Sequence, residues 1–282
     1  MTGPDPASPL RSFNIAKSEF ALRVCSALVL APLALAAAYW GGWPFALFWS
    51  VAAIGTLYEW NALIARQQPL LIAGALVLAV ALGLATAGYV RLAVTVIVVG
   101  SLATAMLGAT GQRIWIAVGI LYAASLGAAP ILLRSDLEYG FVTIIFLFAV
   151  VWATDTSAYV AGRAIGGPKL LPRVSPKKTW AGALGGAIGA IIAALVVAEL
   201  SGLDAVAIAV LAGALSILAQ AGDLFESFLK RRFGAKDSSG LIPGHGGLMD
   251  RLDGFVAAGF AAAVIGVLRG GFATPGRGLL VW

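Results

Sequence analysis

Long apolar runs separated by short polar intervals make up most of the chain. A helix of about 20 mostly apolar residues can cross the roughly 30 Å hydrocarbon core of a bilayer. By this criterion the pattern predicts nine membrane spans, at residues 20–40, 43–64, 69–88, 90–108, 113–133, 139–161, 179–200, 203–226 and 251–270. We therefore expect an all-α, polytopic integral membrane protein.

Three regions of the chain differ in how many polar and charged residues they carry. Residues 1–19 are polar, contain Pro and Ser, and are expected to form a disordered tail. Residues 20–138 carry sparse charge and short loops, and the apolar run at their start is too long for the core of a signal peptide. Residues 139–282 hold nearly all of the candidate chemistry and are the candidate catalytic region, with polar loops at 162–178 and 227–250.

The composition supports a membrane protein and excludes an ordinary soluble domain. Hydrophobic residues make up 60% of the chain and charged residues only 11%, whereas soluble domains carry about 25% charged residues. The 35 glycines fit closely packed membrane helices, because small residues let helix backbones approach one another. A single cysteine, Cys25, excludes an intramolecular disulfide framework and a cysteine-based zinc site.

The distribution of basic residues predicts the orientation. With a cytoplasmic N-terminus and nine spans, all but four of the 19 lysines and arginines fall on the cytoplasmic side. The four on the other side are Arg91, Arg134, Arg269 and Arg277. Both long polar loops then face the cytoplasm, where nucleotides are found, and we expect the protein in the inner (cytoplasmic) membrane of the cell.

Two acidic pairs flank the second polar loop. Asp223, Glu226 and Lys230 are spaced i, i+3, i+7 and share one helix face. Asp250 and Asp253 are spaced i, i+3 at the start of the ninth span. A compact loop between the two helices would bring these acids to one membrane level, and converging carboxylates suit Mg2+. Alternatively, the second pair only caps the N-terminus of its helix.

The loop between the acidic pairs contains turn-forming residues. Pro243-Gly244 and Gly246-Gly247 flank His245, the one histidine of the chain. Glycines permit positive φ angles and let backbone N–H groups approach an anion closely. The loop lacks the GxxxxGK[ST] pattern of a Walker A motif. The histidine fits a catalytic and a structural role equally well.

The first polar loop is basic. Ser175-Pro176 predicts a helix start, with Ser as the N-cap and Pro at the first helical position. Lys177 and Lys178 would then lie in the first turn with Thr179, where lysines oppose the helix dipole unless an anion binds. The alternative is an ordinary positively charged anchor on the cytoplasmic side.

Two further acids lie at predicted membrane depth. Asp155 lies near the inner end of the sixth span, and Glu59 lies within the second. An acid at this depth costs about 3 kcal/mol on insertion scales, so it usually faces a polar cavity or a partner. For Glu59 a hydrogen bond in helix packing is an equally good interpretation. Basic loops, carboxylates and glycine-rich turns at one membrane surface together indicate phosphoryl or nucleotidyl transfer to an amphiphile.

Three segments carry a more specific pattern. The first extends over 27 residues and reads Ser227-x-x-Lys230-Arg231-x4-Lys236-Asp237, then Pro243-x-His245-Gly246-Gly247-x-x-Asp250-Arg251-x-Asp253. The second is Ser175-Pro176-Lys177-Lys178-Thr179-Trp180, and the third surrounds Asp155 in WATDTSAYVAGR. These segments resemble the motifs of the phosphatidate cytidylyltransferase (CDP-diacylglycerol synthase) family. They cover roughly the second half of the chain, and the first half resembles the family only in being hydrophobic.

The resemblance implies the Mg2+-dependent reaction CTP + phosphatidate → CDP-diacylglycerol + pyrophosphate at the lipid bilayer, as a step of phospholipid biosynthesis. It also implies that no nucleic acid is a partner, and that a homodimer is to be considered. The catalytic residues that it implies are Asp223, Asp250, Lys178 and Lys236. The metal ligands that it implies are Asp223, Asp250, Asp253 and Asp155. The substrate-binding residues that it implies are Ser175, Lys177, Lys178, Thr179, Lys230, Arg231, His245, Gly246 and Gly247.

One position departs from the family pattern and keeps alternatives open. The family usually has an acid after Thr179-Trp180, and this chain has Ala181. An inactive or altered homologue that accepts a different lipid phosphate is therefore an alternative, and the sequence does not specify the lipid tails. A transporter would place charges near the midplane and broken helices in both halves. A non-enzymatic membrane scaffold is another alternative. A CDP-alcohol phosphotransferase is disfavoured, because no Ala-Arg follows Asp253-Gly254 at the required spacing.

Overall fold

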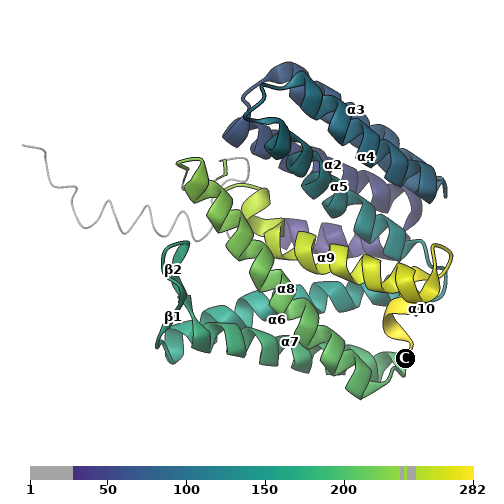
Figure 1. The fold of residues 1–282 in the computed structure, drawn as a ribbon. Helices are drawn as coiled ribbons and strands as arrows, with labels where there is room; N and C mark the ends of the chain where they lie inside the picture. Colours follow the sequence, from purple (N-terminus) through teal and green to yellow (C-terminus); the bar gives the residue numbers. More distant parts are fainter. Residues whose placement is uncertain (1–27, 236–237, 240–245) are drawn as a thin grey trace, which may run out of the picture.

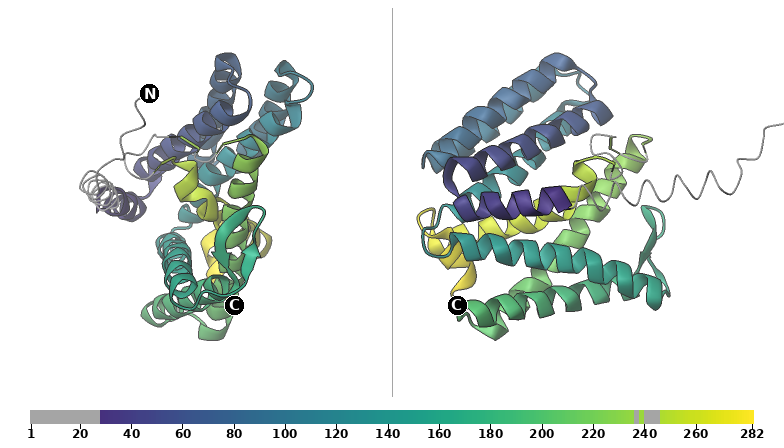
Figure 2. Two further views of the ribbon diagram at one scale, coloured as in Figure 1. Left: turned by 90° about the vertical axis from the view of Figure 1, so that its left-hand side faces the viewer. Right: turned by 180° about the vertical axis from the view of Figure 1, so that it is seen from behind.

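A computed structural model describes residues 28–235, 238–239 and 246–282 as a bundle of long helices with one short hairpin (Figures 1 and 2). The long helices are α2 (Gly42–Ile64), α3 (Gln68–Thr86), α4 (Val90–Leu107), α5 (Arg113–Arg134), α6 (Gly140–Ala164), α7 (Trp180–Ser201), α8 (Ala205–Arg232) and α9 (Met249–Gly270). A helix at Leu28–Trp40 precedes α2, and the short α10 (Pro275–Leu280) follows α9. Strands β1 (Lys169–Leu171) and β2 (Ser175–Thr179) pair antiparallel between α6 and α7.

The helices confirm an all-α polytopic membrane protein, apart from the hairpin. Within the described ranges, the seven helices α3 to α9 are long and apolar enough to cross a membrane. Helix α2 coincides with another predicted span, but Glu59 and Asn61 lower its mean hydropathy. Leu28–Trp40 falls within the predicted first span, whereas residues 1–19 lie outside the described residues. The total of nine spans and the cytoplasmic N-terminus stay predictions.

The prediction that Ser175-Pro176 begins a helix is wrong. These residues lie in β2, which pairs with β1, and proline is tolerated because each strand of a two-stranded hairpin has an unpaired edge. Helix α7 begins at Trp180, and Thr179 is its N-cap, with Oγ1 accepting a hydrogen bond from the Gly182 N–H at 3.1 Å. The two lysines of β2 therefore precede α7 and do not oppose its dipole from the first turn.

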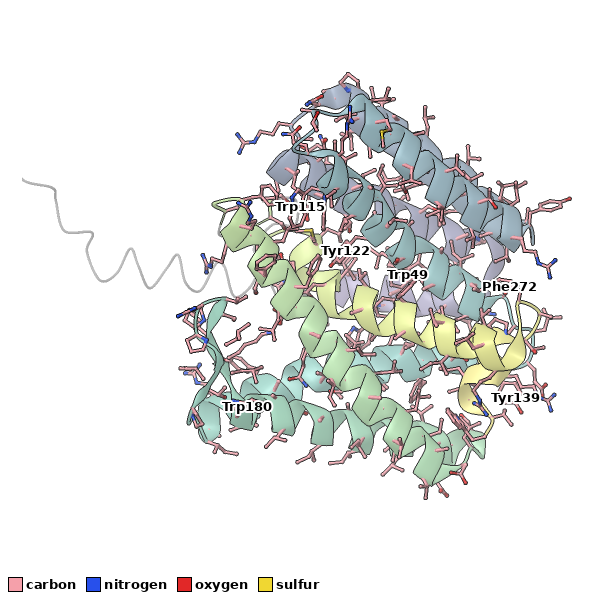
Figure 3. The ribbon with its side chains drawn as sticks, viewed as in Figure 1. Trp49, Trp115, Tyr122, Tyr139, Trp180 and Phe272 are labelled. Carbon is pink, nitrogen blue, oxygen red and sulfur yellow. The ribbon has the colours of Figure 1, made fainter. Side chains whose placement is uncertain are left out.

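An aromatic cluster joins the two halves of the chain. Trp49 of α2 stacks on Phe255 of α9 with ring centroids 4.7 Å apart, and Phe148 of α6 lies 6.3 Å from the same indole. Figure 3 places Trp49 in the interior of the bundle. Since buried aromatic pairs contribute large apolar areas with specific geometry, this cluster fixes α9, which carries candidate site residues, against the N-terminal helices.

A glycine face of α7 packs closely on α6. A Cβ at Gly185 would lie 2.3 Å from the Ala161 Cβ, and one at Gly189 would lie 2.0 Å from the Ser157 Oγ. Such distances are too short for any side chain, so the two backbones approach as closely as glycine permits. This contact holds α6, which carries Asp155, against α7.

The polar elements gather at one end of the bundle. The hairpin, the C-terminal end of α8 and the N-terminal end of α9 lie at the same end, on the left of Figure 1, and α10 lies at the other. At the α10 end, the buried Asp136 accepts hydrogen bonds from the N–H groups of Tyr139 at 2.9 Å and Arg277 at 2.8 Å. The described parts of the two predicted polar loops therefore lie on one side.

Candidate functional site

A cavity of about 690 Å3 opens at the hairpin end, between β2 and the helices α6, α7, α8 and α9. This volume lies within the range of about 300–1,000 Å3 that is usual for small-molecule sites. Its charged lining consists of the basic side chains Arg163, Lys177, Lys178, Lys230 and Arg251 and the acidic side chains Asp155, Asp223, Glu226, Asp250 and Asp253. We call this the charged cavity; its described wall carries five basic and five acidic side chains.

The helical spacing predicted from the sequence is confirmed. Asp223, Glu226 and Lys230 all line the charged cavity from one face of α8, as their i, i+3, i+7 spacing requires. Asp250 and Asp253 line it from the first turns of α9. The two acidic pairs therefore meet, as expected for helices that are joined by one compact loop.

A lysine of the hairpin reaches an acid of α8. The Lys178 Nζ forms an ion pair with the Asp223 Oδ2, and their side chains are 26% and 36% exposed. Ion pairs with this much exposure contribute little to stability, about 0–1 kcal/mol. Separating Lys178 from Asp223 therefore costs little free energy. Such a weak ion pair suits side chains that leave each other to bind a ligand.

A second lysine forms a buried bridge between α8 and α9. The Lys230 Nζ lies 2.7 Å from the Glu226 Oε2 and 2.5 Å from the Asp250 Oδ1. The lysine side chain is 15% exposed, and the two carboxylate side chains are 2% and 13% exposed. The other glutamate oxygen, Oε1, is buried and has no hydrogen-bond partner in the described part of the chain. It is an oxygen donor available to a cation or a water molecule.

Asp250 is held by donors on both of its oxygens. Besides Lys230 on Oδ1, its Oδ2 accepts hydrogen bonds from the Gly247 N–H at 2.9 Å and the Ser238 hydroxyl at 2.9 Å. The bond from the Gly247 N–H ties Asp250 to the turn that precedes α9, whose N-cap is Leu248. Asp250 thus organises the start of α9 and also borders the charged cavity.

The remaining candidates divide into three groups. Ser175, Arg231, Gly246 and Gly247 do not line the charged cavity. Gly246 has a φ of 83°, which confirms the expected positive φ in this turn. Thr179 lines the cavity, but its buried hydroxyl oxygen caps α7. The predicted residues Lys236 and His245 lie outside the described residues.

Sequence reasoning missed Gln220 and the partners of Glu59. Gln220 lines the charged cavity, and its Nε2 donates hydrogen bonds to the Ala183 carbonyl at 3.2 Å and the Ser216 Oγ at 3.4 Å. Its position three residues before Asp223 would have placed it on the same helix face. Glu59, which the sequence had singled out as an acid at membrane depth, accepts hydrogen bonds from the N–H groups of Leu248 and Met249 at the start of α9, and no local pattern indicates these partners.

The charged cavity contains carboxylates that could serve as oxygen ligands of a metal ion. Within residues 28–235, 238–239 and 246–282, no group of three or more His, Cys, Asp or Glu side chains lies close enough to hold a metal ion alone. Mg2+ commonly takes one or two carboxylates and completes its shell with water and phosphate oxygens. Asp155, Asp223 and Asp253 supply hard oxygen donors of that kind.

The departure at Ala181 lies beside the cavity. Thr179, Gly182 and Ala183 line the charged cavity, and Ala181 does not. Ala181 is therefore not part of the described wall, and the departure leaves the five acids of the cavity in place.

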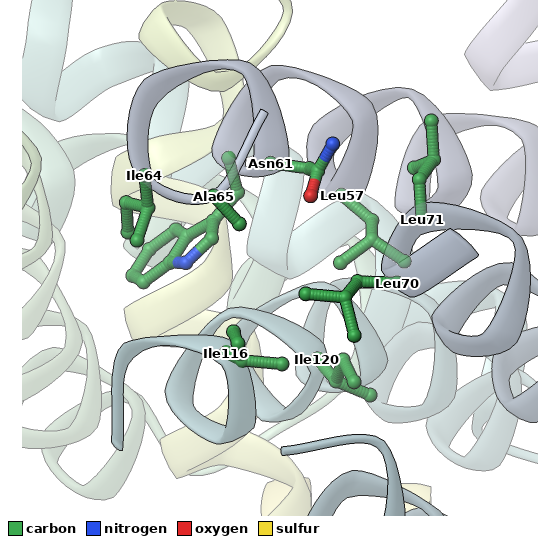
Figure 4. Close-up of a pocket in the computed structure, with 9 residues that line it drawn as sticks. Leu57, Asn61, Ile64, Ala65, Leu70, Leu71, Ile116 and Ile120 are labelled. Carbon is green, nitrogen blue, oxygen red and sulfur yellow. The ribbon is translucent and has the colours of Figure 1, made fainter. Parts of the chain in front are cut away.

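A second, much smaller cavity lies between α2, α3 and α5 (Figure 4). Its volume is about 20 Å3, and Figure 4 shows Leu57, Leu70 and Ile120 directed into it. A space of this size holds about one water molecule. It is too small for a substrate, so the charged cavity is the candidate site.

Comparisons with known proteins agree with this geometry. The model of the cytidylyltransferase family matches residues 21–268. Phosphatidate cytidylyltransferase of Brucella abortus biovar 1 (strain 9-941) is 41% identical over 269 residues, which cover 92% of this chain and 96% of the relative. The Rickettsia felis protein of the same name is 26% identical over 248 residues (85% and 89%), and that of Bacillus subtilis (strain 168) is 38% identical over 122 residues (42% and 45%). The chain therefore belongs to the cytidylyltransferase family.

Proposed function

We propose that this protein transfers the cytidylyl group of CTP to phosphatidate, giving CDP-diacylglycerol and pyrophosphate. The observation that carries the proposal is the charged cavity, which brings basic side chains and carboxylates together at one end of a membrane bundle. Basic side chains suit the phosphates of both substrates, and carboxylates suit a divalent cation. Membership of the cytidylyltransferase family supports the same reaction.

The reaction needs no covalent enzyme intermediate. An oxygen of the lipid phosphate forms a bond to the α-phosphorus of CTP, and the bond from that phosphorus to the bridging oxygen of the β-phosphate breaks. Pyrophosphate leaves with the bonding electron pair. Positioning and charge neutralisation supply most of the catalysis in such transfers, so the protein's task is to hold two anionic substrates together.

The basic residues of the cavity are the proposed phosphate ligands. Lys177 and Lys178 approach from β2, Arg163 from α6 and Arg251 from α9. Lys178 is paired with Asp223, so an incoming phosphate would take the lysine and release the aspartate for a cation. Lys230 is held by two acids, and we assign it to the positioning of these acids.

We propose Asp223, Asp250, Asp253 and Asp155 as the residues that would hold Mg2+. The ion would neutralise charge on the phosphates of CTP and on the leaving pyrophosphate. Asp223 and Asp250 are the proposed principal ligands, and the Oδ1 of Asp250 accepts a hydrogen bond from the Lys230 Nζ at 2.5 Å. The ion pair to Lys178 would keep Asp223 in place before the cation binds.

Apolar side chains beside the cavity suit a substrate with lipid tails. Tyr159 of α6 and Trp180 of α7 are 65% and 53% exposed, and Figure 3 shows Trp180 next to the hairpin. Exposed aromatic residues of membrane proteins favour the interface between headgroups and tails.

We propose that the charged cavity faces the cytoplasm at the inner membrane. We also propose that the protein assembles as a homodimer, which crosslinking in membranes would test.

A transporter is a weaker candidate. Its charges would lie near the membrane midplane at the interface of two repeats. The charged cavity is instead lined by residues of the hairpin, and the hairpin lies at one end of the bundle (Figure 1).

The test uses purified protein in detergent with CTP labelled at the α-phosphorus. Incubation with phosphatidate should move the label into the organic phase as CDP-diacylglycerol, with release of one pyrophosphate for each product. Diacylglycerol in place of phosphatidate is the matched control, since it lacks the attacking phosphate. Label in the organic phase with both lipids, or with neither from folded protein, would refute the proposed reaction.

A further inference from the structure

Glu59 lies in α2, in the half of the chain that contributes no described residue to the charged cavity. Its side chain is fully buried, with a relative exposure of 0%. Nevertheless, its Oε1 accepts a hydrogen bond from the Leu248 N–H at 2.8 Å, and its Oε2 accepts one from the Met249 N–H at 2.7 Å. A carboxylate of one helix thus satisfies two backbone donors at the start of another.

The start of α9 depends on this distant acid. Leu248, its N-cap, makes no side-chain capping hydrogen bond of its own. The first N–H groups of a helix have no partners within the helix, and the helix dipole favours a negative charge beside them. Glu59 supplies both the acceptors and the charge, so the position of the first turn of α9 is tied to α2.

Two serine hydroxyls extend the contact to Asp250. The Ser239 hydroxyl donates a hydrogen bond to the Glu59 Oε1. The Ser238 Oγ lies 3.1 Å from the Glu59 Oε2 and 2.9 Å from the Asp250 Oδ2. Since a hydroxyl has one proton, Ser238 can donate to one of these carboxylates at a time. It therefore links the buried acid to a carboxylate of the charged cavity.

Glycine at position 247 permits this convergence. A Cβ at Gly247 would lie 1.6 Å from the Ser238 Oγ, 2.8 Å from the Glu59 Oε2 and 2.9 Å from the Asp250 Oδ2. No side chain fits among these three groups. The two carboxylates and the hydroxyl therefore surround the backbone of a residue without a side chain. The Gly247 N–H donates a hydrogen bond to the Asp250 Oδ2 at 2.9 Å.

We propose that Glu59 is a positioning residue of the transfer reaction. It fixes the start of α9, and through Ser238 and Gly247 it orients Asp250, whose other oxygen contacts Lys230 at the cavity wall. The inference rests on the proposed function, because the orientation of Asp250 matters only if the charged cavity performs the reaction. Glu59 itself does not touch the cavity.

The test compares Glu59→Gln with Asp136→Asn. Both wild-type carboxylates are buried and accept backbone N–H groups beside a helix start, but Asp136 lies at the opposite end of the bundle. Glutamine keeps the length of the side chain but turns one acceptor into an N–H2 donor that faces other donors. We expect kcat to fall about 10- to 100-fold in Glu59→Gln, as for a misplaced reacting group, with a smaller change in the KM for CTP.

The control separates positioning from mere stability. Asp136→Asn should lower the melting temperature to a similar extent as Glu59→Gln. It should leave kcat within about 3-fold of the wild-type value, because Asp136 is remote from Asp250. Equal losses of kcat in both variants, or an unchanged kcat in Glu59→Gln, would overturn the inference. If Glu59→Gln does not fold, Ser238→Ala decides: a lowered kcat with an unchanged melting temperature supports the inference, and an unchanged kcat overturns it.

Hydrogen exchange distinguishes failure of the inference from failure of the proposed function. The amide protons of Leu248 and Met249 should exchange faster in Glu59→Gln than in the wild type, and this result does not depend on which substrate the protein uses. A wild-type protein that makes no CDP-diacylglycerol refutes the proposed function, and with it the catalytic part of the inference. Unchanged exchange in an active protein overturns the inference alone.

Discussion

Replacing Lys230 by methionine removes the counter-charge of two acids at once. The Lys230 Nζ lies 2.7 Å from the Glu226 Oε2 and 2.5 Å from the Asp250 Oδ1, and all three side chains are at most 15% exposed. Methionine keeps much of the side-chain length and leaves both carboxylates without a cation. Removing one partner of a buried pair costs about 3–5 kcal/mol.

Lys178→Met is the matched control for this loss of charge. Lys178 also pairs with a carboxylate, Asp223, but the two side chains are 26% and 36% exposed, and such pairs contribute about 0–1 kcal/mol. With about 2–4 °C per kcal/mol, we expect the melting temperature to fall by about 6–20 °C in Lys230→Met. The same conversion gives a fall of less than about 4 °C in Lys178→Met.

The assay is thermal unfolding in detergent, followed by circular dichroism of the helices. A third variant, Lys230→Met combined with Glu226→Gln, removes one of the two uncompensated charges and should recover part of the loss. Equal falls of the melting temperature in Lys230→Met and Lys178→Met would refute burial as the cause of the larger expected loss in Lys230→Met. A double variant that is no more stable than Lys230→Met would refute the role of Glu226.

Four further outcomes follow from the same geometry. Lys178→Ala should raise the KM of CTP or phosphatidate about 10-fold in steady-state kinetics, because one charged hydrogen bond to phosphate is lost. Gly185→Leu should lower the melting temperature, since its Cβ would lie 2.3 Å from a side chain of α6, whereas the open Gly83→Ala should not. Ala181→Glu should leave the turnover rate within about 3-fold in the labelled-CTP assay, because position 181 does not line the cavity. EDTA should abolish turnover, and added Mg2+ should restore it.

The parts of the fold that the sequence predicted are those set by local patterns. Hydropathy located the helices, because a span needs about 20 consecutive apolar residues. The spacing of Asp223, Glu226 and Lys230 placed them on one face, because the helical period is fixed at 3.6 residues per turn. The meeting of the acids of α8 and α9 was expected because a short segment, residues 233–248, connects the two helices.

The parts that the sequence did not predict depend on contacts between distant segments. Ser175-Pro176 has the local pattern of a helix start, but β2 has its strand partner in Lys169–Leu171 and forms a hairpin. Glu59 lies 189 residues before the Leu248 N–H that it accepts, so no local spacing could reveal this contact. The resemblance to a family identified the chemistry, whereas the connection from α2 to the cavity required the structure.

The most direct test of the central claim is the rate of CDP-diacylglycerol formation by Asp223→Asn. Asparagine keeps the shape of the side chain but removes the negative charge that pairs with Lys178 at the cavity wall. We predict that turnover falls by about 100-fold or more, the scale of losing one group that stabilises transition-state charge, with an unchanged melting temperature. A folded variant that retains turnover within about 3-fold of the wild type would contradict the assignment of the charged cavity as the site of the reaction.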